Sequence, residues 1–286
     1  MTSAHARVVP GTGARVTSAA MPSLLALASL VVLGAGTSPA SHAPATGREA
    51  LEAMRRAYGG RWYSTLTFVQ KTTRKDAQGK DTVETWFESL RHTPARGTEL
   101  RIDRGSPAEG NGVLYTARRT RVFRVGALSA DRAGGNALLP LIEGVYLQPV
   151  ATTVDELAPT GVDWSRPVVQ GRWEERPVWI VGASSKDDTH SPQVWVDAER
   201  KVVVRALLVP VPGAPFMDVR IGHFVPVGGG WLGTRCEFLV DGKLDQLEDY
   251  EDWKAGVDLS PALFEPATFK TAKHWAAGLA TSKDGG

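Results

Sequence analysis

Cysteine is almost absent from this chain: Cys236 is the only one among 286 residues. A single cysteine excludes an internal disulfide. No cysteine directly follows the N-terminal apolar run, so the thiol needed to attach lipid to a mature N-terminus is missing there. Cys236 lies in the strand-like stretch TRCEFLV, and we expect it to be a small buried apolar side chain rather than a reactive thiol.

An excess of charge of either sign is also missing. The chain has 33 Lys and Arg residues against 31 Asp and Glu residues. Such a balance produces no strong field to hold a nucleic acid or an anionic membrane. With 42% hydrophobic and 22% charged residues, the composition is that of a folded protein with a substantial core.

Signatures of catalysis are lacking as well, because no Gly-x-Ser-x-Gly nucleophile elbow occurs. The loop SSKDDTHS, residues 184–191, gathers Ser185, Asp187, Asp188 and His190. Neighbours in one turn seldom adopt the geometry of a catalytic triad or a metal site. The sequence therefore predicts no catalytic residue, no metal and no cofactor, and a hydrolase that uses His190 and Asp188 is the minor alternative.

The remaining polar residues of interest are scattered. His92, His223 and His274 have no partner nearby in sequence, and a surface or strand position is expected for each. The acidic run DQLEDYED, residues 245–252, alternates with Leu247 and Tyr250. We interpret this run as an exposed strand face rather than a calcium site.

The N-terminal residues 1–43 have the pattern of a cleavable signal peptide. The apolar run from Leu24 to Gly36 is too short to span a bilayer, and the small residues up to Ala43 suit a signal peptidase, with cleavage after Ala43. The basic flank is thin, so Met21 is an alternative start, and a short buried helix is the alternative structure. No later stretch is long enough to cross a membrane.

An amphipathic helix is expected directly after the leader. Thr46 and Glu49 have capping-box spacing, at which each side chain accepts a hydrogen bond from a backbone N–H near the other. Apolar residues then recur at helical spacing from Leu51 to Tyr58. The Gly59-Gly60 pair ends the helix.

Alternating patterns next predict ten to eleven strands, joined mostly by short turns. The first two, 66–74 and 82–90, flank a turn that contains Gly79 and are expected to form a hairpin. Short connections favour a sequential antiparallel sheet. The other expected strands cover residues 99–103, 112–116, 120–125, 176–183, 193–197, 201–209, 216–227, 231–240 and 244–250.

Between residues 127 and 172 the pattern changes. An apolar cluster without alternation makes this segment too hydrophobic for a solvated loop, and Thr153 to Glu156 repeats the capping spacing before a short helix. We expect the segment to cover something. The cluster consists of Leu138, Leu139, Leu141, Ile142, Val145, Tyr146 and Leu147.

The expected fold is mainly β (α+β). The strand 202–209 is apolar on both faces, so the sheet must be covered on both sides there, and the only candidate covers are the N-terminal helix and residues 138–157. An incomplete antiparallel β-barrel with an N-terminal helix and a helical lid fits this inventory better than a two-sheet sandwich. We assign residues 44–270 to this domain and 271–286 to a flexible tail.

The chain resembles the periplasmic lipoprotein carriers of the LolA and LolB type and their outer-membrane lipoprotein-sorting relatives. The likeness covers roughly residues 46–266 and consists of pattern and short words. It implies an incomplete β-barrel with a helical lid over an apolar cavity for lipoprotein acyl chains. The matching words are the leader, the capped helix, Phe68-Val69-Gln70, Glu84-Thr85-Trp86-Phe87-Glu88, Leu100-Arg101-Ile102-Asp103, Gly112-Val113-Leu114-Tyr115, Val194-Trp195-Val196-Asp197 with Val204-Arg205, and Leu259-Ser260-Pro261-Ala262-Leu263-Phe264.

Two departures from the family pattern bear on function. The segment 127–172 is longer than expected for a simple carrier, and Arg91, Arg101 and Arg104 are equal candidates for the arginine that the resemblance places in the cavity. The missing lipidation cysteine argues against the membrane-anchored acceptor role.

The leading hypothesis is a soluble periplasmic carrier that binds a lipid-modified protein or another apolar ligand without catalysis. Its partners would be acyl chains and an inner- or outer-membrane protein, with no nucleic acid; a protein-interaction or envelope-sensing module on the same fold is the alternative. Each buried methylene contributes about 0.8 kcal/mol, so acyl chains can bind tightly without polar contacts. The predicted cavity residues are Phe68, Trp86, Leu100, Ile102, Tyr115, Phe123, Trp195 and Phe238, with Leu139, Leu141, Tyr146 and Leu147 in the lid.

Overall fold

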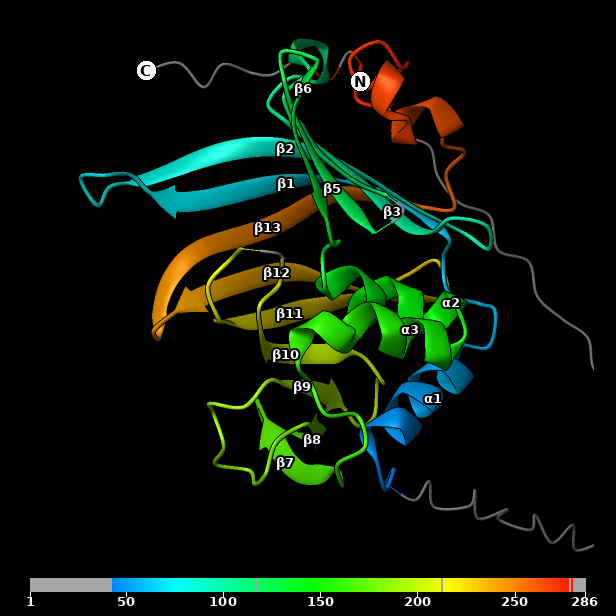
Figure 1. Cartoon of the computed structure of the whole chain (residues 1–286), viewed down its shortest axis with the longest axis vertical. Coiled ribbons are helices and arrows are strands. Elements are labelled where there is room, and N and C mark those ends of the chain that lie inside the picture. The colour runs from blue at the N-terminus through cyan, green and yellow to red at the C-terminus, as the bar shows by residue number, and fades with distance from the viewer. Residues whose placement is uncertain (1–42, 117, 212, 278, 280–286) are drawn as a thin grey trace, which may run out of the picture. The chain divides into compact units, whose positions relative to one another are not determined.

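Thirteen strands form one antiparallel sheet in the computed structural model, which describes residues 43–116, 118–211, 213–277 and 279. The strand order is β6-β5-β4-β3-β2-β1-β13-β12-β11-β10-β9-β8-β7, and Figure 1 shows it curving around the helices. The strands are β1 (Thr65–Lys75), β2 (Asp81–Thr93), β3 (Gly97–Arg104), β4 (Gly112–Thr116), β5 (Arg119–Arg124), β6 (Ala127–Ala133), β7 (Val169–Trp173), β8 (Arg176–Val181), β9 (Gln193–Asp197), β10 (Val203–Leu208), β11 (Met217–Val227), β12 (Gly230–Val240) and β13 (Lys243–Ala255).

The sheet is open, because its edge strands β6 and β7 are the two ends of the strand order. The predicted incomplete antiparallel barrel is thus confirmed as a curved open sheet. The predicted count of ten to eleven strands is too low, because β6 and β7 were not expected. Both are edge strands with largely exposed side chains, so neither carries the apolar alternation by which buried strands are recognised.

The connection between β6 and β7 explains the lid. These strands lie at opposite edges of a sheet that, at a spacing of about 4.8 Å per strand, would be roughly 60 Å wide if flat. Residues 134–168 cross that distance over one face, and the predicted apolar cover is confirmed. The segment contains the π-helical turn η2 (Pro140–Gly144), α2 (Val145–Leu147), α3 (Val150–Leu157) and the 3-10 turn η3 (Ala158–Thr160).

The helix α1 (Gly47–Tyr58) forms where the capping and periodicity predict a helix. It lies beside the lid (Figure 1). Thr46 Oγ1 accepts a hydrogen bond from Glu49 N at 3.3 Å, and the Glu49 carboxylate accepts one from Ala45 N at 2.8 Å. The expected capping box at Thr153–Glu156 is wrong. There α3 begins earlier, after Pro149, and buries Thr153 in its interior, where Thr153 Oγ1 accepts from Gln148 Nε2 at 3.2 Å.

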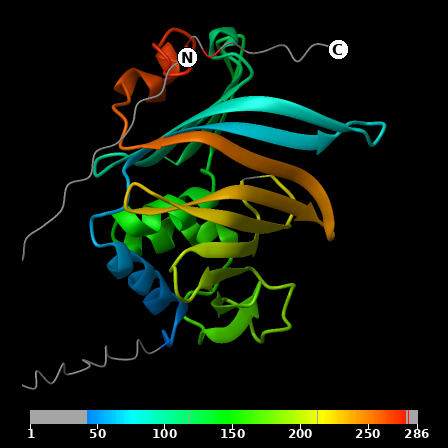
Figure 2. The same ribbon diagram turned by 180° about the vertical axis from the view of Figure 1, so that it is seen from behind.

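The two faces of the sheet have different covers. The helices α1 to α3 and η2 cover one face, which we call the cavity face. The C-terminal segment, with the 3-10 turns η4 (Pro261–Phe264) and η5 (Pro266–Thr268), covers the other face over β2 to β5. Figure 2 shows this segment on the far side of the sheet from the helices.

Packing of the C-terminal segment extends past the predicted domain boundary at residue 270. His274 and Ala276 are buried, and Trp275 Nε1 donates a hydrogen bond of 2.8 Å to Ser89 Oγ on β2. The described part of the predicted flexible tail, residues 271–277 and 279, therefore includes a stretch that packs on the sheet. The signal-peptide prediction falls on residues 1–43, of which 1–42 lie outside the described residues.

Candidate functional site

A mostly apolar cavity of about 120 Å³ lies between the cavity face and the lid. Strands β1 to β3 and β10 to β13 form one wall, and η2 and α2 form the other. Its apolar lining consists of Trp62, Tyr63, Leu66, Phe68, Leu90, Leu100, Ile102, Leu138, Leu139, Ile142, Tyr146, Val202, Val203, Ile221, Phe224, Trp231, Leu232, Cys236, Phe238 and Tyr250.

The size of the cavity shows that the lid is closed. At about 120 Å³ it is smaller than the cavity of roughly 150 Å³ that accepts one benzene molecule in another protein. A long acyl chain therefore has no room until η2 and α2 move away from the sheet.

Aromatic side chains hold the lid against α1. The rings of Trp62 and Tyr146 stack with centroids 3.6 Å apart, and Tyr58 meets both rings edge-on. The hydroxyl of Tyr146 donates a hydrogen bond of 2.9 Å to the Lys201 carbonyl. Aromatic pairs of this kind contribute about 0.5–1.5 kcal/mol each beyond their buried area, so the closed lid is a specific packed arrangement.

One buried carboxyl group belongs to the same contact. Glu143, on the lid turn η2, accepts a hydrogen bond of 2.8 Å from Trp62 Nε1 through Oε2, while its Oε1 has no partner. Burial raises the pKa of Glu143 well above its ordinary value of 4.5, and the Trp62 hydrogen bond opposes this only in part. Burial therefore favours the protonated form of Glu143 in the closed lid.

Two more carboxyl groups lie on the sheet wall of the cavity. Glu88 on β2 and Glu248 on β13 are buried, and burial raises the pKa of each. Repulsion from Glu248 raises the pKa of Glu88 further. The hydroxyl of Tyr250 donates a hydrogen bond of 2.6 Å to Glu248, so the cavity has an apolar end and a polar end.

The buried glutamates predict that stability falls as pH rises. In the unfolded chain Glu143 ionises near pH 4.5, whereas in the folded protein its pKa is higher. The folded state therefore holds more protons above pH 4.5, and stability is lost as pH rises toward the folded pKa, by about 1.4 kcal/mol per pKa unit.

Glu143→Gln removes this ionisation and keeps an acceptor for Trp62. We expect it to unfold at higher urea concentration than the wild type at pH 8 and at nearly the same concentration at pH 4. Glu52→Gln, at a partly exposed position on α1 where Glu52 pairs with Arg56, is the control and should leave the pH slope as in the wild type. An identical pH slope in Glu143→Gln and the wild type would contradict the role assigned to this buried carboxyl group.

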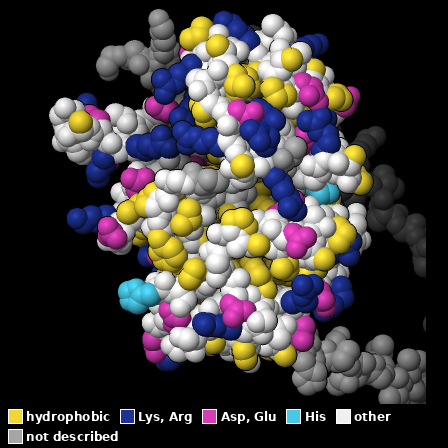
Figure 3. Space-filling model, viewed as in Figure 1, with side chains coloured by type: hydrophobic (Ala, Val, Ile, Leu, Met, Phe, Trp, Pro, Cys, Tyr) yellow, Lys and Arg dark blue, Asp and Glu magenta, His cyan; other side chains and the backbone are white. Residues whose placement is uncertain are grey.

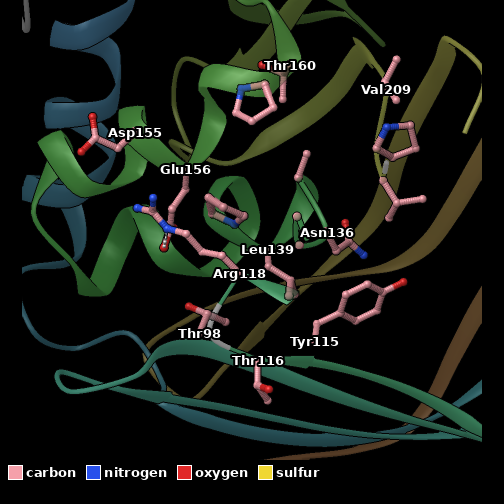
Figure 4. A pocket seen from close by; sticks show the side chains of 17 residues that line it. Thr98, Tyr115, Thr116, Arg118, Asn136, Leu139, Asp155, Glu156, Thr160 and Val209 are labelled. Atoms are coloured by element: carbon pink, nitrogen blue, oxygen red, sulfur yellow. Dashed lines mark ion pairs between the residues drawn. The ribbon is translucent and has the colours of Figure 1, made fainter. Parts of the chain in front are cut away.

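A second pocket of about 270 Å³ opens beside the cavity, between the β3–β4 side of the sheet, α3 and the chain after β10. Leu139 and Asn136 belong to both hollows, and Figure 4 shows Leu139 between Tyr115 and the α3 side chains. Arg118 and Glu156 approach to 3.9 Å across the rim. Displacement of Leu139 would join this mouth to the cavity.

The structure brings half of the predicted cavity and lid residues together. Phe68, Leu100, Ile102 and Phe238 line the cavity wall, as do Leu139 and Tyr146 from the lid. Tyr115 lines the adjacent mouth. These residues were expected from their position on alternating strands and in the apolar cover.

Other predicted residues lie elsewhere. Phe123 is on the opposite face, stacked on Phe269 at 4.0 Å, and Trp195 packs edge-on against Trp173 at 5.5 Å, outside the cavity lining. Trp86 is buried on the cavity face but beyond the cavity lining. For Phe123 and Trp195 the physical reason is register, because a shift by one residue moves a side chain to the other face. Trp86 lies on the cavity face, one cross-strand row beyond Glu88, outside the cavity lining.

Two predicted lid residues, Leu141 and Leu147, are likewise not among the residues that line either hollow. Leu141 is fully buried and Leu147 half-buried, and both pack in the core around the cavity. They therefore anchor the lid in the core and do not line the cavity.

The three candidate arginines lie on different faces of the sheet. Arg91 lies over the Phe264 ring and Arg101 over the Phe269 ring, so both face the C-terminal segment. Arg104 lies over the Trp86 ring on the cavity face. Of these candidates only Arg104 is on the side of the sheet that carries the cavity.

Hydrogen bonds to Asp188 organise the loop 184–191. The Asp188 carboxylate accepts hydrogen bonds from Ser184 N, Ser184 Oγ, His190 N and Ser191 N at 2.8–3.1 Å. These bonds lower the pKa of Asp188. Among the described residues no group of three or more His, Cys, Asp or Glu side chains is placed to hold a metal ion.

The sequence interpretation missed the polar end of the cavity. The run 245–252 was expected to be an exposed face, yet Glu248 is 7% exposed. The signal for Glu88 was present, because Glu88 shares the strand face of Trp86. His274 was expected in an ordinary surface or strand position, but it is buried with Nε2 3.0 Å from Asp103 Oδ2.

Comparison with known proteins identifies the fold. No protein-family model and no curated protein sequence matches the chain. A DUF1329 family protein from Desulfovibrio piger matches with 13% identity and a TM-score of 0.51, covering 77% of this chain and 95% of that one. A putative outer membrane lipoprotein-sorting protein domain from Vibrio parahaemolyticus matches with 12% identity and a TM-score of 0.50, covering 78% and 99%.

A LolA superfamily protein from Nitrosomonas europaea also matches, with 14% identity, a TM-score of 0.44 and coverage of 77% and 97%. Among the described residues no helix combines the length and apolar character that crossing a bilayer requires. At such low identities the first two matches show the fold alone. The chain therefore shares its fold with the DUF1329 family protein and with the putative outer membrane lipoprotein-sorting protein domain, in agreement with the resemblance seen in its sequence.

Proposed function

We propose that this protein is an exported carrier that binds the acyl chains of a lipid-modified protein or of another amphiphile between its curved sheet and its lid. The observation that carries the proposal is the apolar cavity closed by η2 and α2. The leader-like residues 1–43 and the lipoprotein-sorting protein with the same fold support a periplasmic location.

The contacts of the lid support a binding cycle with two states. In the closed state Trp62 and Tyr146 stack, and burial favours the protonated form of Glu143. Opening would expose the apolar ends of both walls to water, at about 25 cal/mol per Å². An acyl chain that replaces the lid contacts offsets this cost, so a long apolar ligand stabilises the open state by differential binding.

Cys236 offers a direct test, because it is the only cysteine and lies in the cavity wall, 3% exposed. We expect a maleimide to label it slowly in the native protein and more slowly still when dodecanoate is bound. Uptake of a fluorescent fatty acid measures binding independently. Extraction of the purified protein for mass spectrometry tests for a ligand acquired during expression.

Cavity-filling variants supply the control. Cys236→Leu adds two heavy atoms to the wall, and Ile102→Phe adds three from β3. Both should reduce fatty-acid uptake at least tenfold while circular dichroism stays unchanged. Cys236→Ser should bind as the wild type does. The proposal would be overturned if the wild type bound no fatty acid. It would also be overturned if both filled variants bound the fatty acid as tightly as the wild type does.

A further inference from the structure

The cavity face changes from apolar to charged along the strands. Counting away from the lid, the cross-strand rows of side chains on β1, β2 and β3 follow one another about 7 Å apart. The registers place in successive rows Leu66, Leu90 and Leu100; then Phe68, Glu88 and Ile102; then Gln70, Trp86 and Arg104; then Thr72 and Glu84; and then Arg74 with Thr82.

Two arginines stand at the far end of this gradient. The guanidinium carbon of Arg104 lies 4.6 Å from the Trp86 ring centroid, and that of Arg74 lies 5.2 Å from the same centroid. Figure 3 shows Lys and Arg side chains gathered in a row at the upper left, where β1 and β2 project beyond the helices. Two cations thus share one aromatic ring beside the cavity.

Neither arginine has a counter-ion. Among the ion pairs of the described residues, none within 4.0 Å includes Arg74 or Arg104. Arg74 Nε donates to the neutral Gln246 Oε1 at 2.7 Å. The nearest acid on this face, Glu84, accepts the Trp86 Nε1 hydrogen at 2.8 Å. Burial lowers the pKa of Arg104, and repulsion from Arg74 lowers it further, so the two guanidinium groups repel each other.

The acids that line the cavity form no ion pair within 4.0 Å with either arginine among the described residues. Burial raises the pKa of both Glu88 and Glu248, which disfavours their ionised forms. The face presents a positive group at one end and hydrocarbon at the other. This is the complement of a molecule with an anionic head and an apolar tail, since guanidinium groups bind phosphate and carboxylate through paired hydrogen bonds.

We infer that Arg74 and Arg104, held over Trp86, bind the phosphate or carboxylate head of an anionic amphiphile whose acyl chain occupies the cavity. This inference rests on the proposed function and names the ligand class of the same site. The distance of two to four rows from the leucine row, roughly 13–27 Å, suits the length of one acyl chain lying along the strands under an opened lid.

The test is a series of ligands with one chain length and different heads. Binding of dodecanoate, dodecyl phosphate, methyl dodecanoate and dodecyltrimethylammonium is measured by displacement of a fluorescent fatty acid at low salt. Both anionic ligands should bind at least tenfold more tightly than the neutral ester, and the cationic one least tightly. Inorganic phosphate should compete only weakly, because the chain contributes most of the affinity; strong competition by phosphate alone would contradict an amphiphile site.

The variant Arg74→Gln/Arg104→Gln should lose the preference for anionic heads and keep its affinity for methyl dodecanoate. Arg124→Gln is the matched control, because Arg124 is an exposed strand arginine on β5. Equal binding of the anionic and neutral ligands, or an unchanged preference in the double variant, would overturn the inference and leave the carrier function standing. Failure of all four ligands to bind would instead count against the carrier function.

Discussion

Arg101→Ala is expected to lower the free energy of unfolding by about 3–5 kcal/mol, the cost of breaking a buried ion pair. Arg101 is 1% exposed. Its Nε and Nη2 atoms each lie 2.7 Å from the Asp103 carboxylate, and Nη2 also donates to the Phe269 carbonyl at 2.6 Å. Removal of the guanidinium takes away the arginine partner of the buried Asp103 carboxyl group. The Leu263 and Phe269 carbonyls of the C-terminal segment also lose a donor.

Urea unfolding followed by tryptophan fluorescence measures this loss. Arg119→Ala, which breaks the half-exposed pair with Asp131, is the matched control and is expected to change stability little. The double variant Arg101→Met/Asp103→Leu should be more stable than Arg101→Met alone, because it removes the stranded carboxylate together with its partner. If Arg101→Ala were no more destabilising than Arg119→Ala, the C-terminal segment would not depend on this cluster.

Trp62→Ala is expected to have the second large effect, a loss of about 3–5 kcal/mol with an opened lid. Trp62 is 4% exposed and contacts Tyr58, Tyr63 and Tyr146 through its ring. Its indole N–H is also the only hydrogen-bond donor to the buried Glu143 carboxyl group among the described residues. The variant removes packing from both α1 and the lid at once.

Maleimide labelling of Cys236 separates lid opening from general loss of stability. In Trp62→Ala we expect labelling to become at least tenfold faster under conditions in which the protein remains folded by circular dichroism. Trp275→Ala is the control, since Trp275 packs on the outer face and donates to Ser89; it should lower stability without exposing the thiol. Equal acceleration in both variants would show that labelling reports global unfolding. Trp62→Phe, which loses only the indole hydrogen bond and part of the ring, should fall between Trp62→Ala and the wild type.

The local order of the chain could be predicted from its sequence. The capped helix α1, the hairpin of β1 and β2 and the glycine turn before β12 follow from interactions between near neighbours. At that turn Gly228 and Gly229 both have positive φ, 52° and 85°, a conformation that glycine adopts without strain. The apolar run after residue 137 also predicted that this segment packs over the sheet, because so many leucines would not be left exposed to water.

The placement of single side chains on one face or the other was harder to predict. Phe68 and Phe238 line the cavity while Phe123 and Trp195 do not, although all four lie in alternating strands. A shift of one residue in the strand register turns a side chain to the other face of the sheet. Bulges such as the one between Thr67 and Val69 shift that register. The alternation shows which residues share a face but not which face the cavity occupies.

By itself the sequence determined most of the elements, the antiparallel pairing of neighbouring strands and the presence of an apolar lid, because these depend on local propensity and periodicity. The edge strands β6 and β7 were the exceptions. Only the tertiary structure decided that β13 pairs with β1, that the C-terminal segment covers the outer face, and that Glu88, Glu143 and Glu248 surround one cavity. These relations join residues far apart in the chain, and the packing of the whole sheet, rather than any short stretch, sets the burial that raises the pKa of those carboxyl groups.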